Sequence, residues 1–285
     1  MLVFADAHVH TNPISGMGVS GYVPRFREYG GWFLAIVSLP PIHYGYDYSI
    51  EGYRKSFEIV ISECKKAREL GVEALCFLGI HPADVEKMLV RIQWSSTKIL
   101  SLVDQVLKMI DRIIRDGLAH GIGEIGRPHY TTKPEAVVLC NYVMERALEM
   151  AKDLDVPVHL HLEQGGYVTV LDIATRVSKL GLKTSKVILH HVDVKTATEA
   201  QQMGLIFTVV GKEPVLRECF KRLHPCYMIE SDFIDDPKRP GVACYPWQII
   251  EVQKKLLSEG VVDEEYLYKL NVDMVRKVYG VEPRQ

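Results

Sequence analysis

The feature of this chain that most constrains its fold is the regular alternation of short apolar runs with longer amphipathic stretches. The runs are rich in Val, Ile, Leu and Phe and have the length of buried strands, whereas the stretches between them carry apolar residues at helical spacing. The expected strands are 2–9, 33–39, 74–80, 119–125, 156–162, 186–191, 204–209 and 226–231. The expected helices are 54–70, 98–117, 134–152, 168–180, 194–202 and 213–222, followed by a helical tail from about 246 to 279.

Eight strands that alternate with helices predict an α/β protein folded as a (β/α)8 TIM barrel, with its active site at the C-terminal ends of the strands. A doubly wound open sheet is the alternative, but no Gly-x-Gly-x-x-Gly follows the first strand. No linker-like or low-complexity segment divides the chain, so we expect one domain over residues 1–285. Long connections at 11–31, 40–53 and 233–245 each follow a strand and should border the active site.

Composition excludes several classes of protein. A formal net charge of −2 gives no overall basic field for non-specific attraction to nucleic acid or to an anionic membrane. The six cysteines have no Cys-x-x-Cys spacing and are expected to be reduced. No signal-peptide pattern and no apolar run of about 18 residues occurs. We therefore expect a cytoplasmic protein with no membrane partner, and its oligomeric state stays open.

Histidines and carboxylates accumulate where the expected strands end. Seven of the eleven histidines lie there, and burying so many polar groups in one barrel mouth is costly unless they become neutral or share a cation. The residues are His8, His10, His81, His159, His161, His190, His191, Glu124 and Asp232.

Local geometry narrows this set. Residues two apart on a strand point to the same side, so His8 and His10 share a face. Glycines near Glu124 leave room for its carboxylate to bridge two ions. On the fifth strand His161 is nearer the open end, which favours it as the ligand over His159, expected to be hydrogen-bonded one layer below.

Two further positions complete the candidate ligands. His190 and His191 are neighbours on one strand, so only one of them should point inward. Asp232, at the tip of the eighth strand, could bind metal and also accept a proton. Two imidazoles from the first strand, one each from the fifth and sixth, and the two carboxylates suffice for two divalent ions such as Zn²⁺, Mn²⁺ or Mg²⁺.

Each residue also has a plainer explanation when it is taken alone. His81 before a proline could only cap a strand, Glu124 could be a surface carboxylate, and Asp232 could begin the turn that Asp235 continues. Their joint placement at strand ends is what favours a metal centre.

These residues resemble those of the TatD family of metal-dependent hydrolases, within the amidohydrolase superfamily of barrels. The similarity covers nearly the whole chain, and its motifs are His8-x-His10, Gly79-Ile80-His81-Pro82, Gly123-Glu124-Ile125-Gly126, Val156-Pro157-Val158-x-x-His161, the sixth-strand histidine and Glu230-Ser231-Asp232. The resemblance implies that His8, His10, Glu124 and Asp232 surround one metal, and that Glu124, His161 and a sixth-strand histidine hold the second. It also implies phosphodiester hydrolysis, typically removal of nucleotides from DNA.

Two departures from the family pattern indicate a divergent branch. Glu163 stands where TatD proteins usually have a basic residue, and there it would repel a phosphate. The sixth strand ends His190-His191-Val192-Asp193, and alignment with phosphotriesterase-like relatives favours His191 as the ligand.

The leading hypothesis is a two-metal phosphodiesterase or deoxyribonuclease that acts on nucleic acid or a small phosphodiester. Two ions about 3.5–4 Å apart would share a water and lower its pKa to about 7. Glu124 and Asp232 are the expected catalytic residues, with Asp232 as proton acceptor, and His81 and His159 are the expected substrate-binding residues. One alternative keeps the metals but hydrolyses a small ester, lactone or amide. Another is a non-catalytic, metal-stabilised barrel subunit.

Overall fold

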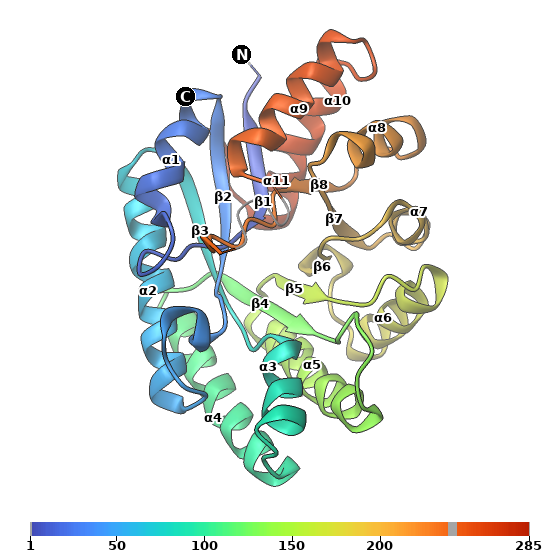
Figure 1. Cartoon of the computed structure of the whole chain (residues 1–285). Coiled ribbons are helices and arrows are strands. Elements are labelled where there is room, and N and C mark those ends of the chain that lie inside the picture. The colour runs from blue at the N-terminus through green and yellow to red at the C-terminus, as the bar shows by residue number, and fades with distance from the viewer. Residues whose placement is uncertain (1, 239–243, 285) are drawn as a thin grey trace.

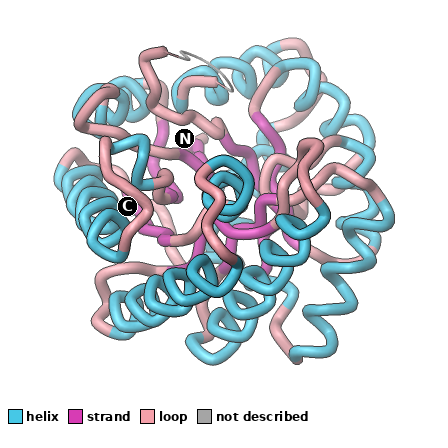
Figure 2. Tube along the Cα trace, turned by 60° about the horizontal axis from the view of Figure 1, so that its bottom comes forward, coloured by secondary structure: helices cyan, strands magenta, loops and turns pink. Residues whose placement is uncertain are grey.

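Eight parallel strands form a nearly closed barrel in the computed structural model, which describes residues 2–238 and 244–284. The strands pair in chain order and helices surround them (Figures 1 and 2). They are β1 (Phe4–Val9), β2 (Gly31–Val37), β3 (Glu73–Leu78), β4 (Gly121–Gly126), β5 (Val158–His161), β6 (Val187–Leu189), β7 (Ile206–Val210) and β8 (Met228–Glu230). The predicted TIM barrel is confirmed.

Backbone hydrogen bonds just beyond β8 join the last strand to the first. Asp232 N donates to His8 O at 3.0 Å, and His10 N donates to Phe233 O at 2.9 Å. This closure places Asp232 beside the His-x-His of β1, although more than 200 residues separate them in the sequence.

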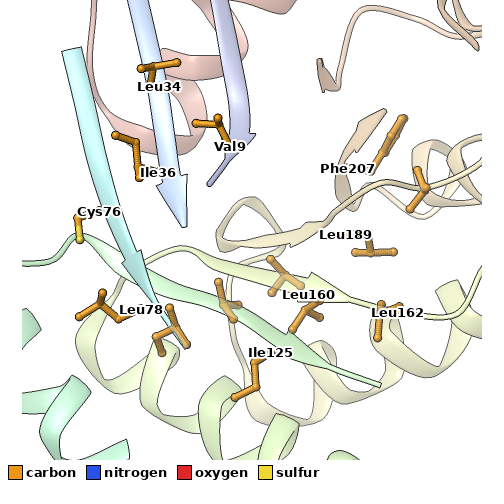
Figure 3. Close-up of a cluster of buried hydrophobic side chains, with 14 of the residues drawn as sticks. Val9, Leu34, Ile36, Cys76, Leu78, Ile125, Leu160, Leu162, Leu189 and Phe207 are labelled. Carbon is orange, nitrogen blue, oxygen red and sulfur yellow. The ribbon is translucent and has the colours of Figure 1, made fainter. Parts of the chain in front are cut away.

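Alternate residues of each strand enter two different layers of the core. In β2, Phe33 and Ala35 face the barrel interior, whereas Leu34 and Ile36 pack with the surrounding helices. Figure 3 shows part of the outer layer, with Leu34 and Ile36 on β2 and Ile36 beside Cys76 of β3. Both faces of the sheet are buried, which explains the nearly continuous apolar runs in the sequence.

The helices follow the expected alternation, with some additions. They are α1 (Gly18–Glu28), α2 (Ile50–Glu69), α3 (Pro82–Glu86), α4 (Ser96–Arg115), α5 (Pro134–Leu154), α6 (Tyr167–Leu180), α7 (Val194–Gln202), α8 (Glu213–Arg222), α9 (Pro246–Ser258), α10 (Glu264–Tyr268) and α11 (Met274–Tyr279). Short turns of other helix types are η1 (Pro41–Tyr44), η2 (Lys87–Arg91), η3 (Thr184–Lys186) and η4 (Lys269–Asp273).

Helix α1 lies in a segment that the sequence predicted as a connection. Its buried side chains Val19, Tyr22, Val23 and Phe26 have helical spacing, but the glycines around them and Pro24 inside the helix obscured the pattern. The expected connection at 233–245 includes residues 239–243, which lie outside the described residues.

The C-terminal segment covers the end of the barrel opposite the predicted site. Asn271 accepts a hydrogen bond from Ala5 N and, through its carbonyl, one from the Trp32 indole, both near the N-terminal ends of their strands. Met274, Val275 and Val278 then pack against the interior core cluster. In the described parts of the chain, no helix is both long and apolar enough to span a membrane.

Candidate metal centre

A cavity of about 320 Å³ opens at the C-terminal ends of the strands. Most of the predicted site residues line it: His10, His81, Glu124, His161, His190, His191 and Asp232. The remaining two, His8 and His159, are fully buried and do not line the cavity. Tertiary structure thus gathers side chains from six strand ends around one small space.

Glu124 occupies the centre of this group. Its Oε1 lies 3.4 Å from His10 Nε2 and 4.0 Å from His8 Nε2. Its Oε2 lies 2.8 Å from His161 Nδ1 and 3.0 Å from His190 Nε2. One oxygen therefore faces the β1 histidines and the other faces those of β5 and β6, as expected for a carboxylate between two cations.

Glycines allow the neighbouring strands to approach this carboxylate. A Cβ added at Gly79, just after β3, would overlap the carbonyl oxygen of Glu124. Gly126, at the end of β4, has a φ of +149° and packs directly on the carbonyl oxygen of His161. Both positions require glycine, since the obstructing atoms are backbone atoms.

Two of the histidines are oriented by acceptors on their far sides. His10 Nδ1 lies 2.9 Å from the carbonyl oxygen of Val37, and His190 Nδ1 lies 3.3 Å from Glu230 Oε1. Because carbonyl and carboxylate oxygens only accept, each Nδ1 carries a hydrogen. Each Nε2 therefore faces Glu124 and would offer its lone pair to a cation bound there, the usual arrangement of metal-binding histidines.

Unpartnered nitrogen atoms indicate that the site suits a cation. His8 Nε2 and His161 Nε2 are buried without a hydrogen-bond partner among the described residues. Leaving such an atom unpaired costs about 1–3 kcal/mol. Binding of a metal ion to these nitrogens would offset that cost. The mixed set of imidazole nitrogens and carboxylate oxygens suits Zn²⁺ or Mn²⁺.

The electrostatics divide the imidazoles of the site into two groups. Although burial opposes it, Glu230 and Glu124 hold the pKa of His190 well above its usual range, and Glu124 and Asp232 raise that of His10. Burial lowers the pKa of His8 well below its usual range and that of His159 to about 3. Burial opposes ionisation of Glu124, but the surrounding histidines, His81 and His190 foremost, hold its pKa well below the ordinary value. Burial also raises the pKa of Asp232 to about 7, against the opposing effect of His190.

The expectation that only one of His190 and His191 points inward is wrong. Strand β6 ends at Leu189, and His191 has a φ of +47°, so the period-two alternation of a strand no longer applies. Both imidazoles line the cavity. His190 Nε2 approaches Glu124, whereas His191 Nε2 lies 3.2 Å from His161 Nδ1, so the geometry favours His190 rather than His191 as the partner of the central carboxylate.

The two histidines expected to bind substrate have different environments. His81 accepts a hydrogen bond from Ala83 N at Nδ1, which leaves a hydrogen on Nε2, 3.6 Å from Glu124 Oε2 and in the cavity wall. It can therefore donate to a substrate. His159 lies between His8 and Tyr279 instead, and this position does not fit direct contact with a substrate.

Acidic residues near the cavity also have separate environments. Asp232 Oδ1 lies 3.9 Å from His10 Nε2, and the side chain keeps 25% of its surface exposed. Asp6, by contrast, is fully buried and accepts a hydrogen bond from Ser231 N at 2.9 Å. Asp6 thus fixes the β1–β8 junction beneath the site.

Glu163 does not line the cavity. Both of its carboxylate oxygens accept hydrogen bonds from the Arg127 guanidinium, at 2.7 and 2.8 Å. Arg127 is almost completely buried and also pairs with Asp172 of α6. The Glu163 carboxylate, which was predicted to repel phosphate, is therefore paired with the Arg127 guanidinium beside the C-terminal ends of β4 and β5.

Several cavity residues were not predicted. His129 and Tyr130 follow β4, His43 lies in η1, and Lys87 begins η2. His129 had a usable signal, since it follows a strand at the end where barrels carry their sites. Lys87 had none, because only the packing of η2 brings it to the cavity.

Comparison with known proteins identifies the family. A family model described as TatD related DNase matches residues 5–280. The chain belongs to this family. It is accordingly a metal-dependent hydrolase, and its His, Glu and Asp side chains form clusters that could hold metal. The expectation of a single domain over 1–285 stays a prediction.

Similar proteins extend over almost the same length. An uncharacterized protein of Methanocaldococcus jannaschii is 24% identical over 286 residues, which cover 99% of this chain and 97% of that protein. A TatD-like protein of Archaeoglobus fulgidus is 18% identical with a TM-score of 0.67, covering 98% of this chain and 100% of that one. The phosphotriesterase homology protein of Escherichia coli, solved with phosphate in its active site, is 15% identical with a TM-score of 0.63, covering 98% of this chain and 99% of that one. At these identities, the two structural likenesses show the shared barrel alone.

Proposed function

We propose that this TatD-family protein hydrolyses phosphodiester bonds in nucleic acid or in a small phosphodiester, with two divalent cations bound around Glu124. The observation that carries the proposal is the division of the Glu124 oxygens between two groups of histidines. A bridging carboxylate of this kind is typical of two-metal hydrolytic sites.

The proposed ligands fall into two sets that share Glu124. His8, His10 and Asp232 complete the first set. His161 and His190 complete the second, with His191 adjacent. Ions held in this way supply a Lewis acid that activates water and neutralises charge on the phosphate.

Other side chains would position the substrate and move the proton. Asp232, partly exposed to the cavity beside His10, accepts the proton of the attacking water. His81 donates from Nε2 to a phosphate oxygen. Lys87 lines the cavity, and its positive charge attracts an anionic substrate.

A small ester, lactone or amide is the second candidate substrate. The cavity volume of about 320 Å³ is at the small end for ligand sites, and Leu39, Pro40 and Ile234 give it an apolar wall. Lys87 favours the phosphodiester over these neutral compounds.

The test combines metal analysis with kinetics. The purified protein is assayed for bound Zn²⁺, Mn²⁺ and Mg²⁺, and then for hydrolysis of single-stranded DNA, bis(p-nitrophenyl) phosphate and a lactone. Glu124→Ala should abolish both metal binding and turnover. Lys87→Met should raise KM for the phosphodiester about fivefold, since a partly screened charge pair contributes about 1 kcal/mol, and leave the lactone unaffected. Lys98→Met is the matched control, because Lys98 lies over the Trp94 ring and away from the cavity.

Three results would contradict the proposal. Absence of metal, or full activity in Glu124→Ala, would refute the two-metal mechanism. A lactone that reacts faster than every phosphodiester would favour the second candidate. Unchanged melting after chelation, with no turnover on any substrate, would indicate a non-catalytic barrel.

A further inference from the structure

A closed chain of hydrogen-bonding groups runs from His8 into the base of the barrel. His8 Nδ1 lies 3.0 Å from His159 Nδ1, and His159 Nε2 lies 3.0 Å from Tyr279 Oη. Tyr279 Oη lies 3.4 Å from the carbonyl oxygen of Ala7, the residue directly before His8. The chain thus begins and ends on neighbouring residues of β1.

The aromatic core holds the tyrosine in this position. The Tyr279 ring packs against Phe33 at 5.1 Å and Phe77 at 5.7 Å between ring centroids, and it stacks on His159 at 6.0 Å. These contacts place the last residue of α11 inside the barrel. A C-terminal side chain therefore reaches the histidine that supports the candidate metal centre from below.

The Nδ1 atoms of His10 and His190 face oxygen atoms that can only accept, whereas His8 Nδ1 faces another imidazole nitrogen. An imidazole nitrogen can donate or accept, so His159 alone does not decide which His8 nitrogen carries the hydrogen. The carbonyl of Ala7 does decide, because it can only accept. When both rings are neutral, only one assignment of donor and acceptor lets the Tyr279 hydroxyl and both imidazole N–H groups of the chain donate to an acceptor.

We infer that Tyr279 and His159 are positioning residues that fix the tautomer of His8. Tyr279 Oη donates to the Ala7 carbonyl and accepts from His159 Nε2–H. His159 Nδ1 is then bare and accepts from His8 Nδ1–H. His8 Nε2, buried and without a partner among the described residues, is left as a lone pair facing Glu124.

The opposite proton order has a specific cost. If Tyr279 donated to His159 Nε2, the hydrogen of His8 would sit on Nε2, and that nitrogen could not bind a metal. It would also be a buried N–H without an acceptor, because the nearest carboxylate oxygen, Glu124 Oε1, is 4.0 Å away. This inference rests on the proposed role of His8 as a metal ligand.

The proton order can be measured directly by NMR. Long-range ¹⁵N–¹H spectra of the full-length, ¹⁵N-labelled chain, before and after Zn²⁺ addition, distinguish Nδ1–H from Nε2–H imidazoles. We expect His8 as the Nδ1–H form and His159 as the Nε2–H form in both samples. His8 in the Nε2–H form before Zn²⁺ is added would overturn the inference, whether or not the protein hydrolyses any substrate.

Zn²⁺ affinity, measured by competition with a chromogenic chelator, provides the second readout. His159→Leu removes the acceptor for His8 Nδ1–H and should weaken Zn²⁺ binding about 10- to 100-fold, as loss of such outer partners typically does. His159→Asn places an amide oxygen near the original Nδ1 position and should restore binding to within about threefold of the unmodified chain.

Tyr279→Phe tests the far end of the chain with a smaller change in shape. We expect Zn²⁺ affinity to fall about 3- to 10-fold and His8 to show a mixture of tautomers. Tyr227→Phe is the control, since Tyr227 is a buried tyrosine whose hydroxyl contacts Tyr266 rather than a histidine. Equal affinity in His159→Leu and His159→Asn, or unchanged His8 tautomers in Tyr279→Phe, would refute the positioning role. If the unmodified chain binds no Zn²⁺, the proposed function fails, and the NMR spectra still decide the proton order.

Discussion

Replacement of Glu163 by glutamine tests whether this carboxylate faces the substrate. The family pattern places a basic residue at this position, so an acidic one predicts repulsion of phosphate. The structure instead directs both Glu163 oxygens to the Arg127 guanidinium and keeps the side chain out of the cavity. Glu163→Gln should therefore affect stability rather than catalysis.

The two explanations predict effects of different size. A carboxylate about 5 Å from a phosphate, at an effective dielectric constant near 20, would repel it by about 3 kcal/mol. Removing that repulsion would raise kcat/KM more than about 100-fold. If the Glu163 carboxylate is instead paired with Arg127, Glu163→Gln removes the charge from an ion pair that is joined by two hydrogen bonds. Arg127 is 9% exposed and Glu163 39%, so the loss lies between exposed and buried pairs, at about 1–2 kcal/mol.

The assay pairs urea denaturation with kinetics on bis(p-nitrophenyl) phosphate. For Glu163→Gln we expect a loss of about 1–2 kcal/mol and kcat/KM within about threefold of the unmodified protein. Glu145→Gln is the control, because Glu145 pairs with Arg176 in the same charge network but on the outer surface of α5. A rise of about 30-fold or more in kcat/KM with unchanged stability would refute the reasoning.

Two further predictions concern positions beside the site. Gly79→Ala should destabilise the protein by about 2 kcal/mol and weaken Zn²⁺ binding, because the new methyl group would overlap the backbone of Glu124; urea denaturation with unchanged midpoints would contradict this. Burial raises the pKa of Asp84 from 3.8 to about 7, so its contribution to stability is full below pH 3.8 and is lost as the pH rises through 7. In Asp84→Asn the free energy of unfolding should therefore decrease less between pH 5 and 8, by about 3 kcal/mol, than in the unmodified protein. Equal pH slopes for the two proteins would show that the carboxyl does not take up its proton on folding.

Much of the barrel could be predicted because its strands have both faces buried. The resulting apolar runs are visible in sequence without knowledge of their partners. Prediction failed where local rules ceased to apply: α1 was obscured by glycines and Pro24, and His191 left the strand geometry through a positive φ. Lys87 reaches the cavity only through the packing of η2, which no pattern in the sequence indicates.

The sequence by itself determined the order of strands and helices and the residue types at the strand ends, because periodicity and motif spacing are local properties. Only the tertiary structure decided which atoms face one another. The opposite orientation of the two Glu124 oxygens, the capture of Glu163 by Arg127, and the link from His8 through His159 to Tyr279 join residues from distant parts of the chain. Barrel closure and packing of the C-terminal helix bring these groups within hydrogen-bonding distance, and no local pattern in the sequence encodes those distances.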